Sequence, residues 1–168
     1  MKETPQQYTE RILGYVEGKQ PLTVQAATAK KLNRFIKSVS RAKLRRRPAP
    51  DKWSVNEILA HLADSEIIIG FRLRLILGAP GSLIAAVDQD SAATSGHYEK
   101  RDPHKSVEQF RVVREANLAL LKPLTPEQWK HYGIHSERGQ ETIEHMVRLY
   151  AAHDVNHLQQ IEKILAEK

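Results

Sequence analysis

The chain has no cysteine among its 168 residues, and this absence excludes three kinds of site at once. A disulfide framework, a thiolate metal site and a cysteine nucleophile all need sulfur that the chain does not carry. Any metal would therefore be held by nitrogen and oxygen ligands. The length suits one domain, which we expect to span residues 1–168, and it is sufficient to bury a core without cross-links.

Long apolar runs are absent as well. The richest stretch, residues 67–77, is interrupted by Gly70, Arg72 and Arg74, whereas a membrane helix needs roughly 18 apolar residues. The first ten residues are polar, so no secretory signal is visible. We therefore expect a cytoplasmic protein that has no membrane partner.

Acidic residues are scarce in the first third of the chain. Residues 1–52 hold 13 Lys and Arg against 4 Asp and Glu, which accounts for the net charge of +6. The densest basic run, residues 41–47, could attract phosphates. No aromatic residues interleave with this run and no nucleic-acid motif is present, so a nucleic-acid partner is not expected.

Alternating, strand-like runs are also missing, and the apolar spacing is helical almost throughout. Long amphipathic segments lie at about residues 22–39, 54–77, 106–122 and 141–166, and a shorter one precedes them. These stripes predict an all-α fold, an antiparallel four-helix bundle with additional short helices.

The boundaries of these helices follow from local patterns. Ser54 with Glu57, and Ser106 with Gln109, have the spacing of capping boxes at helix starts. Ser40 could cap one further turn, and Thr125 a short helix. Residues 78–102 form a long connection with an expected turn of helix at 83–87, and residues 133–139 form a loop between two glycines.

Eight histidines are present, and two of those in the last segment interrupt its apolar stripe. The middle of that stripe is occupied by His153, Asp154, His157 and Leu158. Two imidazoles four residues apart lie on one helix face and can bind one metal ion. His61 flanks the apolar face of the 54–77 helix and is the best candidate for a third ligand.

Three imidazoles would leave one coordination position open, as in catalytic metal sites. Such a set suits a divalent transition metal, namely Zn, Ni, Cu or Fe, and the sequence alone does not choose among them. A histidine on an apolar face can also be a hydrogen-bonded core residue, and the spacing alone leaves this alternative open.

Two motifs resemble the DinB-like superfamily, specifically its branch of metal-binding bundles. The first is Trp53-Ser54-Val55-Asn56-Glu57-Ile58-Leu59-Ala60-His61-Leu62-Ala63-Asp64-Ser65-Glu66, preceded by a proline-rich approach and followed by Arg72. The second is His153-Asp154-Val155-Asn156-His157-Leu158-Gln159-Gln160-Ile161. The likeness spans nearly the whole chain.

This resemblance implies a four-helix bundle whose metal ligands map onto His61, His153 and His157. It also implies a relationship to metal-dependent hydrolases and to transferases that use a low-molecular-weight thiol as cosubstrate. Family members are often homodimers, so the resemblance implies a homodimer here.

The open position would hold the cosubstrate's sulfur in a thiol S-transferase and hydroxide in a hydrolase. A hydrolase would benefit from a nearby base, and Asp154 and Glu66 are the candidate catalytic carboxylates. Asp154 could instead support a ligating imidazole or form a buried ion pair with a basic residue such as Arg72.

Three classes of function therefore remain. The favoured class is a metal-dependent enzyme, either thiol transferase or hydrolase. The second is a non-catalytic bundle that binds a metal or a small ligand. The third is a nucleic-acid-associated stress protein that uses the basic run.

Overall fold

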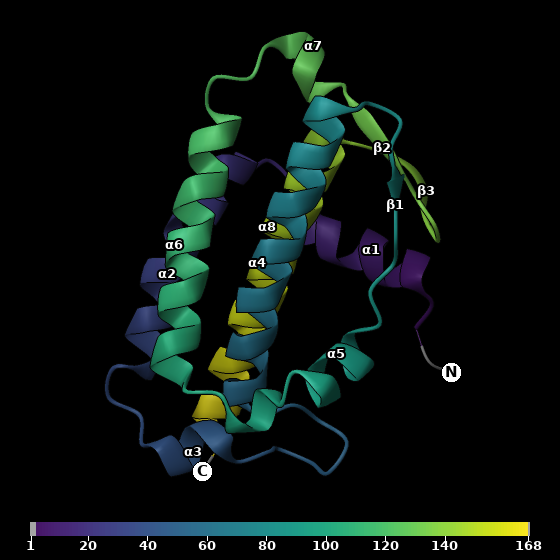
Figure 1. Cartoon of the computed structure of the whole chain (residues 1–168). Helices are drawn as coiled ribbons and strands as arrows, with labels where there is room; N and C mark the ends of the chain where they lie inside the picture. Colours follow the sequence, from purple (N-terminus) through teal and green to yellow (C-terminus); the bar gives the residue numbers. More distant parts are fainter. Residues whose placement is uncertain (1–2, 168) are drawn as a thin grey trace.

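Four long helices form the body of the protein in a computed structural model, which describes residues 3–167 (Figure 1). These helices are α2 (Pro21–Ile36), α4 (Val55–Gly78), α6 (Pro103–Leu121) and α8 (Ile143–Ala166). Each of α2 and α4 packs against both α6 and α8, which closes the bundle. The four-helix bundle predicted from the apolar stripes is confirmed.

The connections set the direction of each helix. Residues 79–102 return the chain to the end of the bundle where α4 begins, so α6 runs in the same direction as α4. Helix α8 runs the opposite way and lies antiparallel to α4 (Figure 1). Shorter helices decorate the bundle: α1 (Pro5–Leu13), η1 (Gly14–Val16), α3 (Arg41–Arg45), α5 (Gln89–Ser95), η2 (Tyr98–Lys100) and α7 (Pro126–Trp129).

Side-chain caps explain most helix starts. Ser54 and Glu57 form the predicted capping box of α4, and Thr125 forms one at α7. The prediction that Ser106 starts a helix is wrong, because α6 begins at Pro103 with Asp102 as its cap. Asp102 accepts two backbone N–H bonds and precedes a proline at the first helical position, which together make the stronger start.

A small sheet, which the sequence did not predict, lies beside the bundle. Its strands are β1 (Leu83–Ile84), β2 (Tyr132–His135) and β3 (Gly139–Thr142). Strand β2 pairs in parallel with β1 and antiparallel with β3. The helical turn expected at 83–87 is therefore wrong, and the predicted loop between the two glycines is a hairpin. The strands are too short to show alternation, and their pairing comes from contacts distant in sequence.

The core consists of two main apolar clusters stacked along the bundle. One surrounds Phe110 and Leu158, and the other surrounds Leu73 and Met146. None of the helices within residues 3–167 is both long and apolar enough to span a membrane. The polar residues described next lie on the same helices as these apolar clusters.

Candidate metal centre

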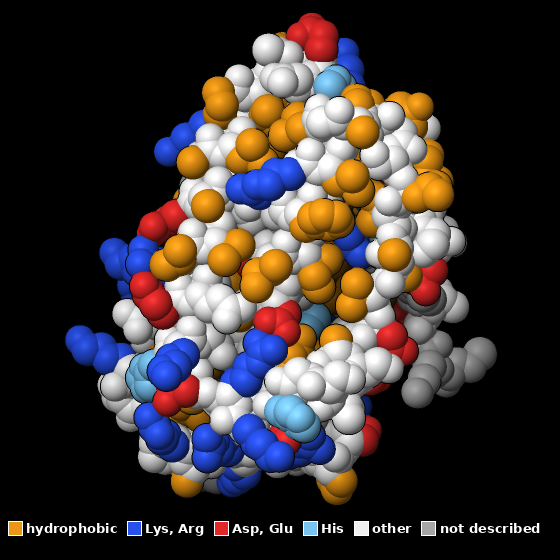
Figure 2. All heavy atoms as spheres, in the orientation of Figure 1, with side chains coloured by type: hydrophobic (Ala, Val, Ile, Leu, Met, Phe, Trp, Pro, Cys, Tyr) orange, Lys and Arg blue, Asp and Glu red, His pale blue; other side chains and the backbone are white. Residues whose placement is uncertain are grey.

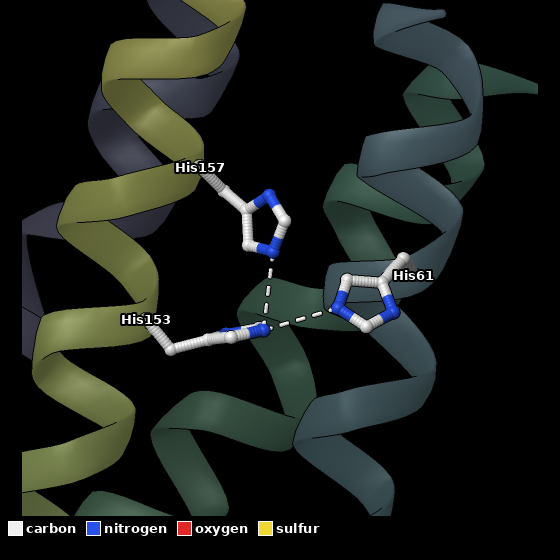
Figure 3. Close-up of side chains that lie close together, drawn as sticks. All are labelled: His61, His153 and His157. Carbon is white, nitrogen blue, oxygen red and sulfur yellow. Dashed lines mark hydrogen bonds between the residues drawn. The ribbon is translucent and has the colours of Figure 1, made fainter. Parts of the chain in front are cut away.

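Three histidines from two antiparallel helices bring their ring nitrogens together (Figure 3). The Nε2 atom of His153 lies 3.0 Å from that of His61 and 3.1 Å from that of His157. The ligand atoms of all three lie within 4.8 Å of one another. Within residues 3–167, no other group of three or more His, Asp or Glu side chains converges in this way.

Local sequence places each ring. His153 and His157 are one turn apart on α8, so they project from the same face. His61 lies in the first turns of α4, where every residue from 55 to 63 is buried. The site therefore exists only where α4 packs against α8, and no single segment of the chain contains it.

Burial keeps these imidazoles neutral. It lowers the pKa of His61 to about 3, with a further lowering from His157. Burial likewise lowers the pKa of His157 to about 4 and that of His153 well below its usual value. A neutral imidazole is the form that binds a metal, so at neutral pH the three rings are in the form that a metal site would require.

Gln160 fixes the tautomer of one ligand. The Nδ1–H of His157 donates to Oε1 of Gln160 at 3.0 Å, which leaves the lone pair of Nε2 directed at the other two rings. The sequence analysis did not single out Gln160. Its position three residues after His157 on a helix was the available indication.

The arrangement fits a divalent transition metal. Two nitrogens that share a tetrahedral zinc ion at about 2.0–2.1 Å lie about 3.3 Å apart. The observed separations of 3.0 and 3.1 Å are close to this value. Three neutral nitrogen donors without a carboxylate suit Zn, Ni, Cu or Fe better than Mg or Ca.

The two candidate catalytic carboxylates, Asp154 and Glu66, are hydrogen-bonded to a buried arginine. Arg114 donates to Oδ2 of Asp154 at 2.6 Å and to Oε2 of Glu66 at 2.7 Å. Thr28 donates to Asp154, and Asn117 donates to Glu66. These contacts favour the structural alternative for Asp154, a buried ion pair, and its partner is Arg114 instead of the suggested Arg72.

This network joins all four bundle helices, since Thr28 lies on α2, Glu66 on α4, Arg114 on α6 and Asp154 on α8. Arg114 is 3% exposed and Asp154 1% exposed. The sequence analysis did not identify Arg114. It lies four residues after Phe110 on the inward face of α6, where the same reasoning that found the histidines would have applied.

The three histidines line an open cleft of about 880 Å³. Trp53 packs on His61 with a ring-centroid distance of 5.0 Å, and Tyr150 packs beside His153 at 5.8 Å. His135 also lines the cleft. Other walls come from α1, from the connection after β1 and from the β2–β3 hairpin.

A family model for the DinB superfamily matches residues 26–161. The chain belongs to the DinB superfamily. The match covers both motifs on which the resemblance was based, and with them all three converging histidines.

Two similar proteins are both named as metal-dependent hydrolases. "Putative metal-dependent hydrolase YfiT" of Bacillus subtilis is 26% identical over 113 residues, which cover 67% of this chain and 64% of that protein. "Putative metal-dependent hydrolase OB0413" of Oceanobacillus iheyensis is 24% identical over 136 residues, or 81% and 78% of the two chains. The chain thus spans slightly less than two thirds of the length of YfiT.

The solved structure of YfiT superposes with a TM-score of 0.81 at 23% identity, covering 86% of this chain and 83% of that one. It is described as a probable metal-dependent hydrolase with an unusual four-helix bundle topology. At this identity the likeness shows a shared fold.

Proposed function

We propose that this DinB-superfamily protein is a divalent-metal-dependent enzyme that acts on a small molecule in the 880 Å³ cleft. One observation carries the proposal: three neutral imidazoles, two buried and one half-buried, converge their Nε2 atoms on the wall of that cleft. The hydrolase names of the relatives and the family resemblance support it.

His61, His153 and His157 are the proposed ligands, with Zn or Ni as the first candidates. A divalent ion, when bound, supplies Lewis-acid activation of a water or a thiol and polarises a carbonyl. The chain's own residues prepare the site: burial keeps the rings neutral and Gln160 orients His157. Trp53 covers one side of His61 and so limits the access of bulk water.

Two reactions fit this site, and a different observation favours each. The names of the relatives favour a hydrolase. The engagement of Asp154 and Glu66 by Arg114 favours a thiol transferase, because a thiol ionises more readily than water and depends less on a protein base. The absence of cysteine agrees with a thiol brought by a cosubstrate. The role of Asp154 or Glu66 as a general base stays a prediction.

Metal content tests the site itself. We expect the purified protein to bind one divalent transition metal per chain by elemental analysis, with Tm rising when Zn or Ni is added. His157→Ala should lose the metal, whereas His145→Ala, on the same helix outside the cleft, should keep it. Metal-free protein whose Tm does not respond to Zn or Ni would contradict the proposal.

The reaction class needs a second assay on the metal-loaded protein. In a transferase, the sulfur of a small thiol bonds to an electrophilic carbon, the thiol proton goes to solvent and the leaving group departs. If the protein consumes free thiol only when an electrophile is also present, the reaction is that of a thiol transferase. Release of acid from an ester or amide panel without thiol would identify a hydrolase instead.

The basic run offers less support for a nucleic-acid partner. Arg41 pairs with Asp102 and Arg47 pairs with Glu57, so these arginines bind acidic groups of the chain itself. Absent or salt-insensitive DNA binding in a filter assay would dispose of this class.

We also propose a homodimer that uses an apolar patch on the outer face of the bundle. Apolar side chains gather over α4, α6 and β1 on the face shown in Figure 2. The large apolar side chains of these elements that are most exposed are Ile67, Phe71, Leu83 and Val112, at 48–81%, and we take these four as the patch. Apolar side chains gathered on one face mark an interaction surface, and a second copy of the chain agrees with the family resemblance.

A further inference from the structure

Arg72 is a buried arginine that pairs with no carboxylate among residues 3–167. Its residue is 6% exposed, and it lies on α4 in the wall of the cleft. It donates from Nη1 to the hydroxyl of Tyr150 at 3.2 Å and from Nη2 to the carbonyl of Ala85 at 2.8 Å. A guanidinium has five N–H donors, so three of them have no acceptor within residues 3–167.

Two other arginines, one buried and one exposed, show what is missing. Arg114 contacts two carboxylates, and Arg138 holds Glu141 through two bonds of 2.6 and 2.9 Å. A buried charge is costly unless an opposite charge accompanies it. Arg72 meets only neutral oxygens among the described residues, and its free donors adjoin the cleft. Its counter-ion is therefore expected from a ligand.

A second donor lies on the same wall. The backbone N–H of Glu137 donates to Nδ1 of His135 at 3.2 Å, so the proton of the neutral ring is on Nε2. No residue of the described chain accepts from that Nε2. In the pairing of β1 with β2, Ile84 lies opposite His135. The next residue, Ala85, accepts the hydrogen bond from Arg72. The pairing therefore brings the side chains of Arg72 and His135 to one place.

The carboxylates in this region leave room for an anion. Arg138 holds Glu141, which therefore does not compete for Arg72. Glu137 is exposed, and solvent screens its charge.

The wall continues from Arg72 to the three histidines. His61, Ser65, Ile68 and Arg72 follow one face of α4, at spacings of four, three and four residues, and all line the cleft. On α8, Tyr150 binds Arg72 and also packs beside His153. The arginine and the metal centre therefore belong to one continuous surface.

We propose that Arg72 and His135 form an anion subsite, which binds a carboxylate or phosphate group of the small molecule that reacts at the three histidines. That the bound molecule reacts at the three histidines rests on the proposed function, whereas the binding of an anion by Arg72 and His135 does not. Tyr150, which binds Arg72, precedes His153 by three residues on α8, and Arg72 follows His61 by eleven residues on α4, or about 5 Å and about 16 Å along the two helices. The substrate or cosubstrate is thus an acid whose charged group lies between these two distances from its reacting atom.

Calorimetric titration of the whole protein tests the subsite. The probes are inorganic phosphate and succinate, each compared with chloride at equal ionic strength, on metal-free and metal-loaded protein. We expect one anion per chain for the wild type. Arg72→Gln should weaken binding about 10- to 100-fold, the value of one or two charge-assisted bonds. Arg148→Gln, an exposed arginine outside the cleft, should leave the affinity unchanged.

Further variants keep the test decisive if Arg72→Gln folds poorly. Arg72→Lys retains the charge without the planar fork and should bind with intermediate affinity. His135→Phe removes the second donor and should weaken binding severalfold. No anion binding by the wild type, or equal affinity in wild type and Arg72→Gln, would overturn the proposal. Metal content is measured on the same samples, so a failure of the metal centre is seen separately from a failure of the anion subsite.

Discussion

At the scale of single residues, the buried histidines keep the form that binds a metal and lower the stability of the fold in acid. In water, a histidine is protonated below its usual pKa of about 6.5. Buried in the bundle, the same side chain stays neutral to a lower pH. His61 and His157 have their pKa lowered by burial to about 3 and about 4. The folded, metal-free protein therefore resists protonation, and acid favours the unfolded chain.

A pH dependence follows for the metal-free protein. Between pH 6.5 and about 4, the unfolded chain binds protons that the folded chain does not, so the free energy of unfolding falls as pH falls through this window. Each such histidine contributes up to about 1.4 kcal/mol per pH unit. Urea unfolding at several pH values measures the slope. His61→Gln should show a shallower slope than the wild type, and equal slopes would contradict the assignment.

Gln160 offers a finer test of the ligand geometry. Its bond to Nδ1 of His157 selects the tautomer that leaves Nε2 free. Gln160→Ala should therefore lower the affinity for Zn about 10- to 100-fold, measured by competition with a chelator. Gln159→Ala, exposed on the same turn, should not change it. Equal affinity for both variants would show that the bond has no role in metal binding.

Residue-scale prediction, from polar side chains that broke or flanked an apolar stripe, singled out His61, His153 and His157, which the structure brings together and whose role as metal ligands stays a prediction. It failed for Gln160 and for the partner of Asp154. Those two depend on which neighbour a side chain reaches after packing. Spacing along one helix carries no information about contacts across helices, such as Arg114 with Glu66, 48 residues away.

At the scale of helices, the buried network around Arg114 fixes how the four meet. Two carboxylates and one guanidinium are almost fully buried and hydrogen-bonded between α2, α4, α6 and α8. Buried ion pairs of this kind stabilise only weakly against an apolar alternative but are costly to break. The network therefore acts mainly on the alignment of the helices that carry the histidines.

Removing the central cation tests this role. Arg114→Met leaves two buried carboxylates without a partner and should lower the free energy of unfolding by about 3–5 kcal/mol. Arg111→Met, which breaks an exposed pair with Glu108 on the same helix, should lower it by at most about 1 kcal/mol. Adding Glu66→Gln and Asp154→Asn to Arg114→Met should recover part of the loss. Similar losses for the two single variants, measured by urea unfolding, would argue against the network.

Helix prediction was accurate where caps and stripes agreed, as at Ser54. It was wrong at Ser106, since a stronger cap lay four residues earlier. The sheet was missed because strands of two to four residues have no periodicity of their own. Strand β1 forms only because β2, about 50 residues later, lies beside it.

At the scale of the whole molecule, the exposed patch of Ile67, Phe71, Leu83 and Val112 predicts self-association. The mass in solution, measured by light scattering after size exclusion, should be that of two chains. Phe71→Glu places a charge in the patch and should give one chain with unchanged metal content. Lys122→Glu, outside the patch, should remain a dimer. A monomeric wild type would refute the proposed homodimer.

The distance along the chain between the ligands has a kinetic consequence. His61 and His153 are 92 residues apart, whereas His153 and His157 share one turn of α8. During refolding, the pair on α8 can capture a metal ion as soon as that helix forms, but the third ligand arrives only when α4 docks. Metal added before refolding would then bind in two phases. The rate of the slower phase would equal the rate at which α4 docks on α8.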